Sequence, residues 1–121
     1  MKTPKIFEKE YHFLEILWDC EPVNSTDLVR LCREKLSWSK ATTYTVIRRL
    51  SERGAVKNEN ALVTSLISRE EVQASEIDEL VEKRFRGSLP AFINTFARHE
   101  KLSETDIEEL EKMISDYRKG K

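Results

Sequence analysis

The sequence predicts a mainly α-helical protein with one short β-hairpin near its middle. Helix-breaking residues are few, since the 121 residues include three Gly and three Pro. Charged residues make up 36% of the chain and hydrophobic residues 39%, and both recur at helical spacing, which is typical of helices with one solvated face. Residues 55–67 differ, because they are rich in β-branched side chains around a turn-prone segment.

The first helix is expected between Phe7 and Cys20. Its apolar residues recur three and four positions apart and form one buried stripe, namely Tyr11, Leu14, Leu17 and Trp18. Charged residues fall outside this stripe, and Pro22 ends the helix. Such an amphipathic helix is expected to bury its apolar side against other elements.

Two further short helices are expected next. Asn24 or Ser25 can cap the second helix, whose buried face consists of Leu28, Leu31, Cys32 and Leu36. Ser39 can cap the third helix, which extends to Gly54, a residue typical of the position after a helix C-terminus. Because each helix is too short to be stable alone, the three are expected to pack on one another.

A hairpin is expected after Gly54. Its strands come from the segments AVKNEN and ALVTSLI, and its turn is predicted at Asn58, Glu59 and Asn60. Three helices followed by a hairpin is the element order of a winged helix-turn-helix, in which the third helix enters the major groove of DNA. We therefore predict that residues 1–67 form a winged helix-turn-helix DNA-binding domain.

The remaining residues, 68–121, are predicted to form three more helices. Ser68, Ser88 and Ser103 stand at capping positions before them. Three helices this small bury little of their own apolar surface, so a second copy would cover it better than a monomeric helical appendage would. We therefore predict a helical dimerisation domain, with an interface made by Leu80, Phe85, Leu89, Phe92, Phe96, Ile107, Leu110 and Ile114.

The third helix has two distinct faces. Its core side consists of Thr43, Val46, Ile47 and Leu50, which leaves a polar side for a ligand. Small and hydroxyl side chains can approach base edges there, while cations can contact phosphates; Arg53 is one such cation. The predicted DNA-binding residues are Ser39, Lys40, Ala41, Thr42, Tyr44, Thr45, Arg48, Arg49 and, in the hairpin, Lys57. The alternative is a solvated helix face without a ligand.

The charge distribution agrees with a DNA-facing segment. The whole chain has a formal net charge of −1. From Arg33 to Lys57 there are seven basic and two acidic residues, whereas from Arg69 to Lys121 there are ten basic and thirteen acidic residues. A basic segment followed by an acidic helical one indicates a phosphate-facing part joined to a part with another role.

No enzyme, metal or cofactor site is expected. Cys20 and Cys32 match no disulfide framework or zinc signature, and His12 and His99 have no metal-binding partner nearby in sequence. The sequence also contains no Gly-rich phosphate loop and no nucleophile motif. It has no signal peptide and no segment that could insert into a membrane, so a cytoplasmic protein is expected.

Four stretches make the chain resemble a known family. They are EKEYHFLEILWDCEPVNSTDLV, WSKATTYTVIRRLSERGAV, SLISREE and GSLPAFINTFARHEKLSETDIEELEKMI. Together they resemble the penicillinase-repressor family of bacterial winged-helix transcriptional regulators, of the BlaI/MecI type, which also includes copper-responsive CopY-type repressors. The Trp-Ser-x-x-Thr motif, followed after a fixed interval by Arg-Leu-x-x-x-Gly, carries most of the resemblance.

The resemblance implies a homodimeric repressor. Its winged helix would bind a dyad operator with half-sites similar to TACA/TGTA, and its C-terminal helices would hold the dimer together. Family DNA contacts would fall on Ser39, Ala41, Thr42, Tyr44 and Thr45, with Arg49 near the DNA backbone. Lys40, Ala41 and Tyr44 stand where the family pattern has Pro, Lys and Arg or Lys, so two long cations are absent from the base-reading positions.

The resemblance also indicates candidate control mechanisms. In penicillin-responsive members, a membrane-bound sensor protease cuts the repressor at an Asn–Phe bond in the C-terminal region. The matching pair in this chain is Thr95–Phe96, with Asn94 displaced by one position. The Cys-x-Cys pair of the copper-responsive members is absent from this sequence. The sequence does not name the releasing signal, and proteolysis is one candidate.

The sequence as a whole favours a dimeric DNA-binding repressor that occludes a dyad operator. Its expected partners are double-stranded operator DNA, a second copy of the chain and, as a candidate, a membrane sensor protease. The alternative is a winged-helix protein-interaction module whose apolar C-terminal half holds a partner.

Overall fold

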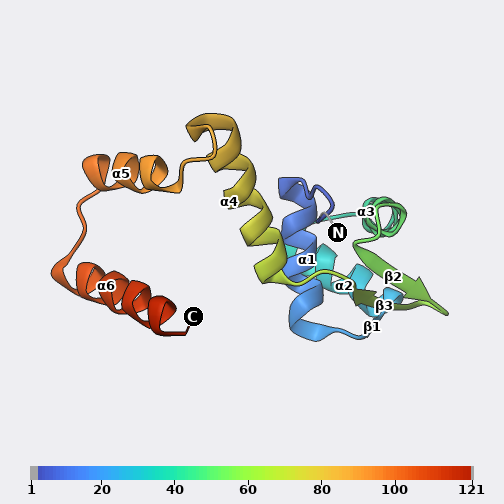
Figure 1. Cartoon of the computed structure of the whole chain (residues 1–121). Coiled ribbons are helices and arrows are strands. Elements are labelled where there is room, and N and C mark those ends of the chain that lie inside the picture. The colour runs from blue at the N-terminus through green and yellow to red at the C-terminus, as the bar shows by residue number, and fades with distance from the viewer. Residues whose placement is uncertain (1–2, 121) are drawn as a thin grey trace. The chain divides into compact units, whose positions relative to one another are not determined.

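The structure is a computed structural model that describes residues 3–120. It confirms the predicted fold class: a mainly helical chain in which three helices and a hairpin precede three further helices (Figure 1). The elements, in chain order, are α1 (Glu8–Cys20), β1 (Val23–Asn24), α2 (Ser25–Leu36), α3 (Lys40–Glu52), β2 (Val56–Glu59), β3 (Leu62–Ser65), α4 (Arg69–Phe85), α5 (Leu89–His99) and α6 (Glu104–Lys119).

The described residues form two compact units. The first unit extends to Ile77 and the second begins at Asp78. The packing division therefore lies inside α4, whereas the sequence suggested a boundary before this helix, after residue 67. The physical reason is that the first turn of α4 belongs to the core of the first unit, where Val72 is 1% exposed.

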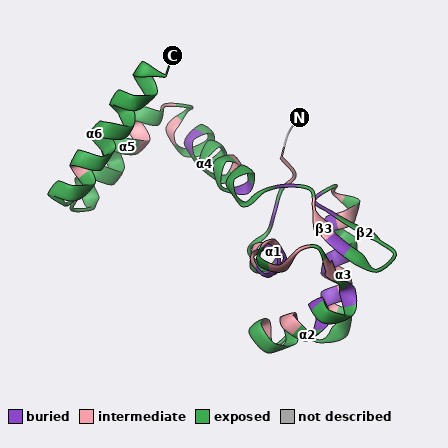
Figure 2. Cartoon of the chain, turned by 90° about the horizontal axis from the view of Figure 1, so that it is seen from below, coloured by how far each residue is buried: buried purple, intermediate pink, exposed green. Residues whose placement is uncertain are grey.

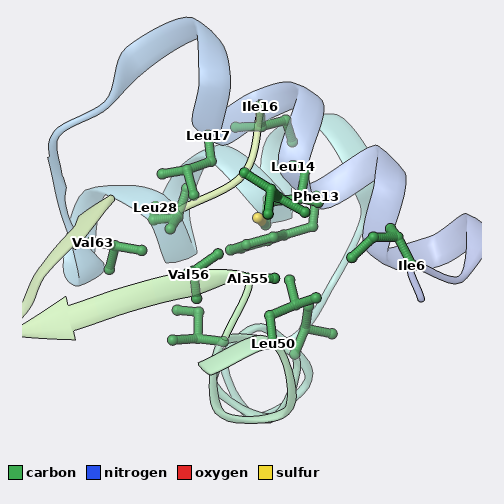
Figure 3. Close-up of a cluster of buried hydrophobic side chains, with 14 of the residues drawn as sticks. Ile6, Phe13, Leu14, Ile16, Leu17, Leu28, Leu50, Ala55, Val56 and Val63 are labelled. Carbon is green, nitrogen blue, oxygen red and sulfur yellow. The ribbon is translucent and has the colours of Figure 1, made fainter. Parts of the chain in front are cut away.

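The core of the first unit lies between α1, α2, α3 and the sheet (Figure 3). Phe13, Leu14 and Leu17 from α1 meet Leu28 from α2 and Leu50 from α3, and all five are fully buried. Each such side chain contributes about 1.5–3 kcal/mol when it is removed from water. This core fixes which side of α3 remains available at the surface.

Helix α1 buries a wider face than the sequence predicted. Leu14 and Leu17 are buried as expected, but Tyr11 and Trp18 are half-buried, while Phe13 and Ile16 join the core. The face is wider because α1 packs against α2, α3 and β3 rather than against one neighbour. The half-buried Trp18 still has a fixed orientation, since its indole Nε1 donates to the carbonyl oxygen of Ile67 at 3.0 Å.

The sheet contains a third strand, β1, in addition to the two that were predicted. β1 pairs antiparallel with β3, with Val23 opposite Val63, and β3 also pairs with β2. The hairpin turn is formed by Asn60 and Ala61, both with positive φ (54° and 64°), so Asn58 and Glu59 belong to β2 instead of the turn. Two central residues with positive φ match the twist of a two-residue hairpin.

The second unit contains the end of α4 together with α5 and α6. The predicted caps are present: the Ser88 hydroxyl accepts from the Ala91 N–H at 3.1 Å, and Ser103 accepts from the Asp106 N–H at 3.0 Å. Among the described residues of this unit, Val81 alone is buried, and α5 and α6 are largely exposed (Figure 2). None of the helices within residues 3–120 is long and apolar enough to span a membrane.

Candidate nucleic-acid interface

The first turn of α3 is held by a compact set of hydrogen bonds. The Ser39 hydroxyl accepts from the Thr42 N–H at 3.1 Å and donates to Thr42 Oγ1 at 3.0 Å, while the Thr43 hydroxyl donates to the Ser39 carbonyl oxygen at 3.3 Å. The Ser39 side chain therefore satisfies one free N–H of the helix start, as its predicted capping role requires. It also orients the Thr42 side chain.

The predicted core side of α3 is confirmed, which leaves the predicted DNA-binding residues on the other side. Thr43, Val46, Ile47 and Leu50 are all buried. The exposed residues on the opposite side are Ser39, Lys40, Ala41, Arg48 and Arg49, and the half-buried ones are Thr42, Tyr44 and Thr45. The helix thus brings together eight of the nine predicted residues.

The ninth residue, Lys57, lies on β2 and is exposed. Its ammonium group lies 3.4 Å from a Glu59 carboxylate oxygen, and Arg48 forms a similar exposed pair with Glu52 at 3.4 Å. Exposed pairs of this kind are worth about 0–1 kcal/mol, so a phosphate can displace the acidic partner. Lys40 and Arg49 form no ion pair with any residue between positions 3 and 120.

Arg53 does not belong to this exposed side, which corrects its expected role as a phosphate contact. Its guanidinium forms an ion pair with the buried carboxylate of Glu10 and donates to the carbonyl oxygen of Lys5. It also lies 5.4 Å from the centre of the Phe7 ring. The charge of Arg53 therefore neutralises a buried carboxylate within the first unit, a role that its position on a helical wheel does not reveal.

Two aromatic contacts position the start of α3. The Trp38 ring stacks on Phe13 with their centroids 6.2 Å apart and their planes 2° from parallel. The Lys9 ammonium lies 5.2 Å from the centre of the Trp38 ring. Because Trp38 immediately precedes the cap residue Ser39, these contacts hold the beginning of α3 against α1.

The hairpin is anchored at its base and at its turn. The Glu21 carboxylate accepts from the Ser65 N–H at 2.6 Å and from the Ser65 hydroxyl at 2.8 Å. At the other end, the Ser25 N–H donates to the carbonyl oxygen of Ala61 at 2.8 Å. The Ser25 hydroxyl oxygen also lies 3.2 Å from the hydroxyl oxygen of Tyr44, which joins α2 to α3. These contacts of Ser25 and Glu21 could not be predicted from the sequence, because they join residues far apart in the chain.

The two cysteine thiols lie in or beside the core of the first unit. Cys32 is fully buried, and this burial raises the pKa of its thiol to about 11. Burial also raises the pKa of the half-buried Cys20 thiol. Between positions 3 and 120, no group of three or more His, Cys, Asp or Glu side chains is arranged to hold a metal ion.

The second unit exposes most of the predicted dimerisation residues. Five of the eight are exposed, and Phe85, Phe92 and Ile107 are half-buried. The exposed ones are Leu80, Leu89, Phe96, Leu110 and Ile114. Ile93, Met113 and Tyr117 are exposed on the same helical faces, although they are not among the eight predicted residues. The Thr95–Phe96 pair lies inside α5, and both residues are exposed.

Comparison with known proteins gives one family match. The family described as penicillinase repressor matches residues 6–116. The methicillin resistance regulatory protein MecI of Staphylococcus aureus (strain Mu50) is 25% identical to this chain over 118 residues, which cover 94% of this chain and 96% of that protein. The penicillinase repressor of Bacillus licheniformis is 20% identical over 124 residues, which cover 99% and 97%.

Two solved structures resemble part of this chain. The solution structure of the DNA-binding domain of the repressor BlaI matches it with a TM-score of 0.50 and 25% identity. The Bacillus licheniformis BlaI monomeric form, in complex with the blaP half-operator, matches it with a TM-score of 0.51 and 24% identity. Each match covers 59% of this chain and 93% of the other one, and both agree with the winged-helix fold.

Proposed function

Because this chain belongs to the penicillinase-repressor family, a family of transcriptional repressors and not of enzymes, we propose that it is a dimeric repressor that binds and occludes a dyad DNA operator. The observation that carries the proposal is the polar outer side of α3, presented by a helix whose other side is buried. We call α3 the recognition helix and the β2–β3 hairpin the wing.

The residues of the recognition helix divide by chemistry into two roles. Ala41, Thr42 and Thr45 are small enough to let the helix approach the base edges, where methyl groups can contact thymine and hydroxyls can form hydrogen bonds. Lys40 and Arg49 contact phosphates, which fix the register without reading sequence. The set of contacts is completed by Ser39, Arg48 and, from the wing, Lys57.

Dimerisation gives this interface its symmetry. The exposed apolar side chains of α5 and α6 form the contact with a second copy, which removes from water a surface that a monomer leaves exposed. Two recognition helices then reach half-sites about 34 Å apart, one turn of DNA. In the cytoplasm, such a dimer bound at a promoter would block the access of RNA polymerase to the DNA.

Loss of the dimer would release the operator. When the two DNA-binding units are joined, the second half-site binds as an intramolecular event, so separation lowers affinity without altering any single contact. The sequence and the structure do not name the releasing signal; cleavage at Thr95–Phe96 by a membrane sensor protease is one candidate, and both residues are exposed within α5.

Selection of duplexes from a random pool tests this proposal. The purified protein is expected to recover sequences with dyad symmetry, and their binding is expected to weaken steeply between about 50 and about 200 mM salt. Recovery of single half-sites without symmetry would contradict the dimeric arrangement. If binding were absent or independent of salt, the chain would instead be a protein-interaction module with a winged-helix fold.

A further inference from the structure

We propose that Tyr44 and Ser25 form a positioning pair that sets the orientation of the recognition helix relative to the wing. Their hydroxyl oxygens lie 3.2 Å apart and join the second turn of α3 to the first residue of α2. The inference rests on the proposed function, because its consequence is read in DNA binding. It gives Tyr44 a different role from the other residues on the outer side of α3.

Ser25 is connected to the wing as well as to the recognition helix. Its backbone N–H donates to the carbonyl oxygen of Ala61, which lies in the hairpin turn, at 2.8 Å. The preceding residue, Asn24, pairs with Leu62 of β3 and caps α2 through its side chain. Ser25 is 5% exposed, so its hydroxyl has little access to water. The backbone of this residue is therefore fixed by the wing, and its side chain is available to hold α3.

Tyr44 lies at the centre of the side of α3 that faces DNA in our proposal. Ala41 precedes it by three residues and Arg48 follows it by four, so the three lie along one side of the helix. Yet the Tyr44 ring is half-buried and packs against the core of its own unit. With its hydroxyl at Ser25, this side chain is held back on the protein, where it restrains rotation of α3 about its axis.

This restraint determines which side chains meet the bases. A rotation of α3 would move Thr42 and Thr45 relative to the groove floor, while the long arginine side chains could still follow the phosphates. Loss of the hydroxyl pair is therefore expected to reduce discrimination between sequences more than it reduces general affinity for DNA.

A double-mutant cycle tests the pair. Tyr44→Phe, Ser25→Ala and the double variant are compared with the wild type for binding to a duplex recovered by selection and to a scrambled duplex, at two salt concentrations. Each single variant is expected to raise the Kd for the selected duplex about three- to tenfold, the effect of one lost hydrogen bond. The double variant is expected to bind no more weakly than the weaker single variant, because both changes remove the same contact.

Two readouts separate positioning from a direct DNA contact or general damage. The Kd for the scrambled duplex and the salt dependence are expected to remain unchanged, since no cation is removed. Tyr11→Phe is the matched control, because it removes the hydroxyl of another half-buried tyrosine, one that contacts Gln73 of α4. This control is expected to bind both duplexes like the wild type. Ser25→Gly replaces Ser25→Ala if the latter does not fold.

Four results would overturn the inference. Additive losses in the double variant, or wild-type binding by either Ser25 variant, would mean that Tyr44 acts independently of Ser25. An equal loss on the selected and scrambled duplexes would make Tyr44 a contact to the DNA backbone. If the wild type bound no duplex at all, the proposed function would fail first, and the role of the pair in DNA recognition would fail with it.

Discussion

Arg49 and Arg53 show how residues of the same type on one helix can have different roles. They lie four positions apart on α3 and its C-terminal cap, yet Arg49 is exposed and Arg53 pairs with Glu10. The difference comes from Glu10, which is 43 positions away from Arg53 in the chain. No local sequence pattern distinguishes the two arginines, and both were therefore predicted to contact phosphates.

We predict that Arg53→Ala lowers the free energy of unfolding by about 2–3 kcal/mol. The change would leave the Glu10 carboxylate, which also accepts from the Phe7 N–H at 2.9 Å, buried without its cation. The loss is expected to be below the 3–5 kcal/mol of a fully buried pair, because the Arg53 side chain is 29% exposed. Denaturant unfolding measures it. Arg49→Ala is the control and should stay within about 0.5 kcal/mol of the wild type, so equal losses would contradict the assignment.

A second prediction concerns the division of roles on the outer side of α3. Arg49→Ala should weaken binding to all duplexes alike and reduce the salt slope by about 1, because one phosphate contact is lost. Thr42→Ala should instead weaken binding at particular base pairs, with the salt slope unchanged. Fluorescence anisotropy with a set of single-base operator variants distinguishes the two patterns. The opposite result would exchange the two roles.

A third prediction concerns the buried thiol of Cys32. Burial disfavours its charged form and raises its pKa from the ordinary thiol value of 9.0 to about 11. Its contribution to stability is therefore fully present below about pH 9 and is lost as the pH rises towards about 11. Denaturant unfolding of the wild type and of Cys32→Ala should show a stability difference that shrinks over this range. A constant difference would mean that the thiol does not titrate in this way.

At the scale of the elements, the turn of the wing holds a non-glycine residue in an unfavourable conformation. Ala61 has a φ of 64°, in the left-handed region. Ala61→Gly should raise the free energy of unfolding by about 0.5–1 kcal/mol, because glycine adopts this conformation without a steric penalty. Ala74→Gly, in the exposed interior of α4, is the control and should lower it by a similar amount. A loss in both variants, measured by thermal unfolding, would contradict this account of the turn.

The helices could be predicted from the sequence more fully than the sheet. The buried side of α3 and the caps at Asn24, Ser39, Ser88 and Ser103 follow from local spacing and side-chain chemistry, and the structure confirms them. Strand β1 could not be found in this way, because its two residues carry no alternating pattern and become a strand only by pairing with β3. The Tyr44–Ser25 contact could not be predicted either, because it joins residues 19 positions apart and depends on how α2 and α3 pack.

At the scale of the whole molecule, the second unit differs from the first in how little apolar surface its own residues bury. Helices α5 and α6 each begin with a serine side chain that caps the helix. The apolar side chains of these two helices are nevertheless largely exposed among the described residues of this unit. Capping stabilises a helix end by about 1 kcal/mol, whereas the larger stabilisation has to come from packing. A second copy is the cover that we propose.

We predict that Ile114→Lys prevents the proposed dimer from forming and leaves a monomer. Ile114 is 64% exposed in α6, and a charge there would be buried without a partner in the dimer. Glu108→Lys introduces the same side chain elsewhere on the same helix, away from the apolar stripe, and is expected to remain dimeric. Sedimentation equilibrium gives both masses. A dimeric Ile114→Lys variant would place the interface on another surface.

The helical state of residues 89–99 sets a condition on any proteolytic release of this protein. Proteases bind the peptide that they cleave in an extended conformation, whereas the bond between Thr95 and Phe96 lies within an intact turn of α5. Scission would therefore require this helix to unwind first, and its rate would follow the small population of unwound molecules. Warming, or loss of the serine at position 88, would enlarge that population and shorten the lifetime of repression, even with the amount of protease held constant.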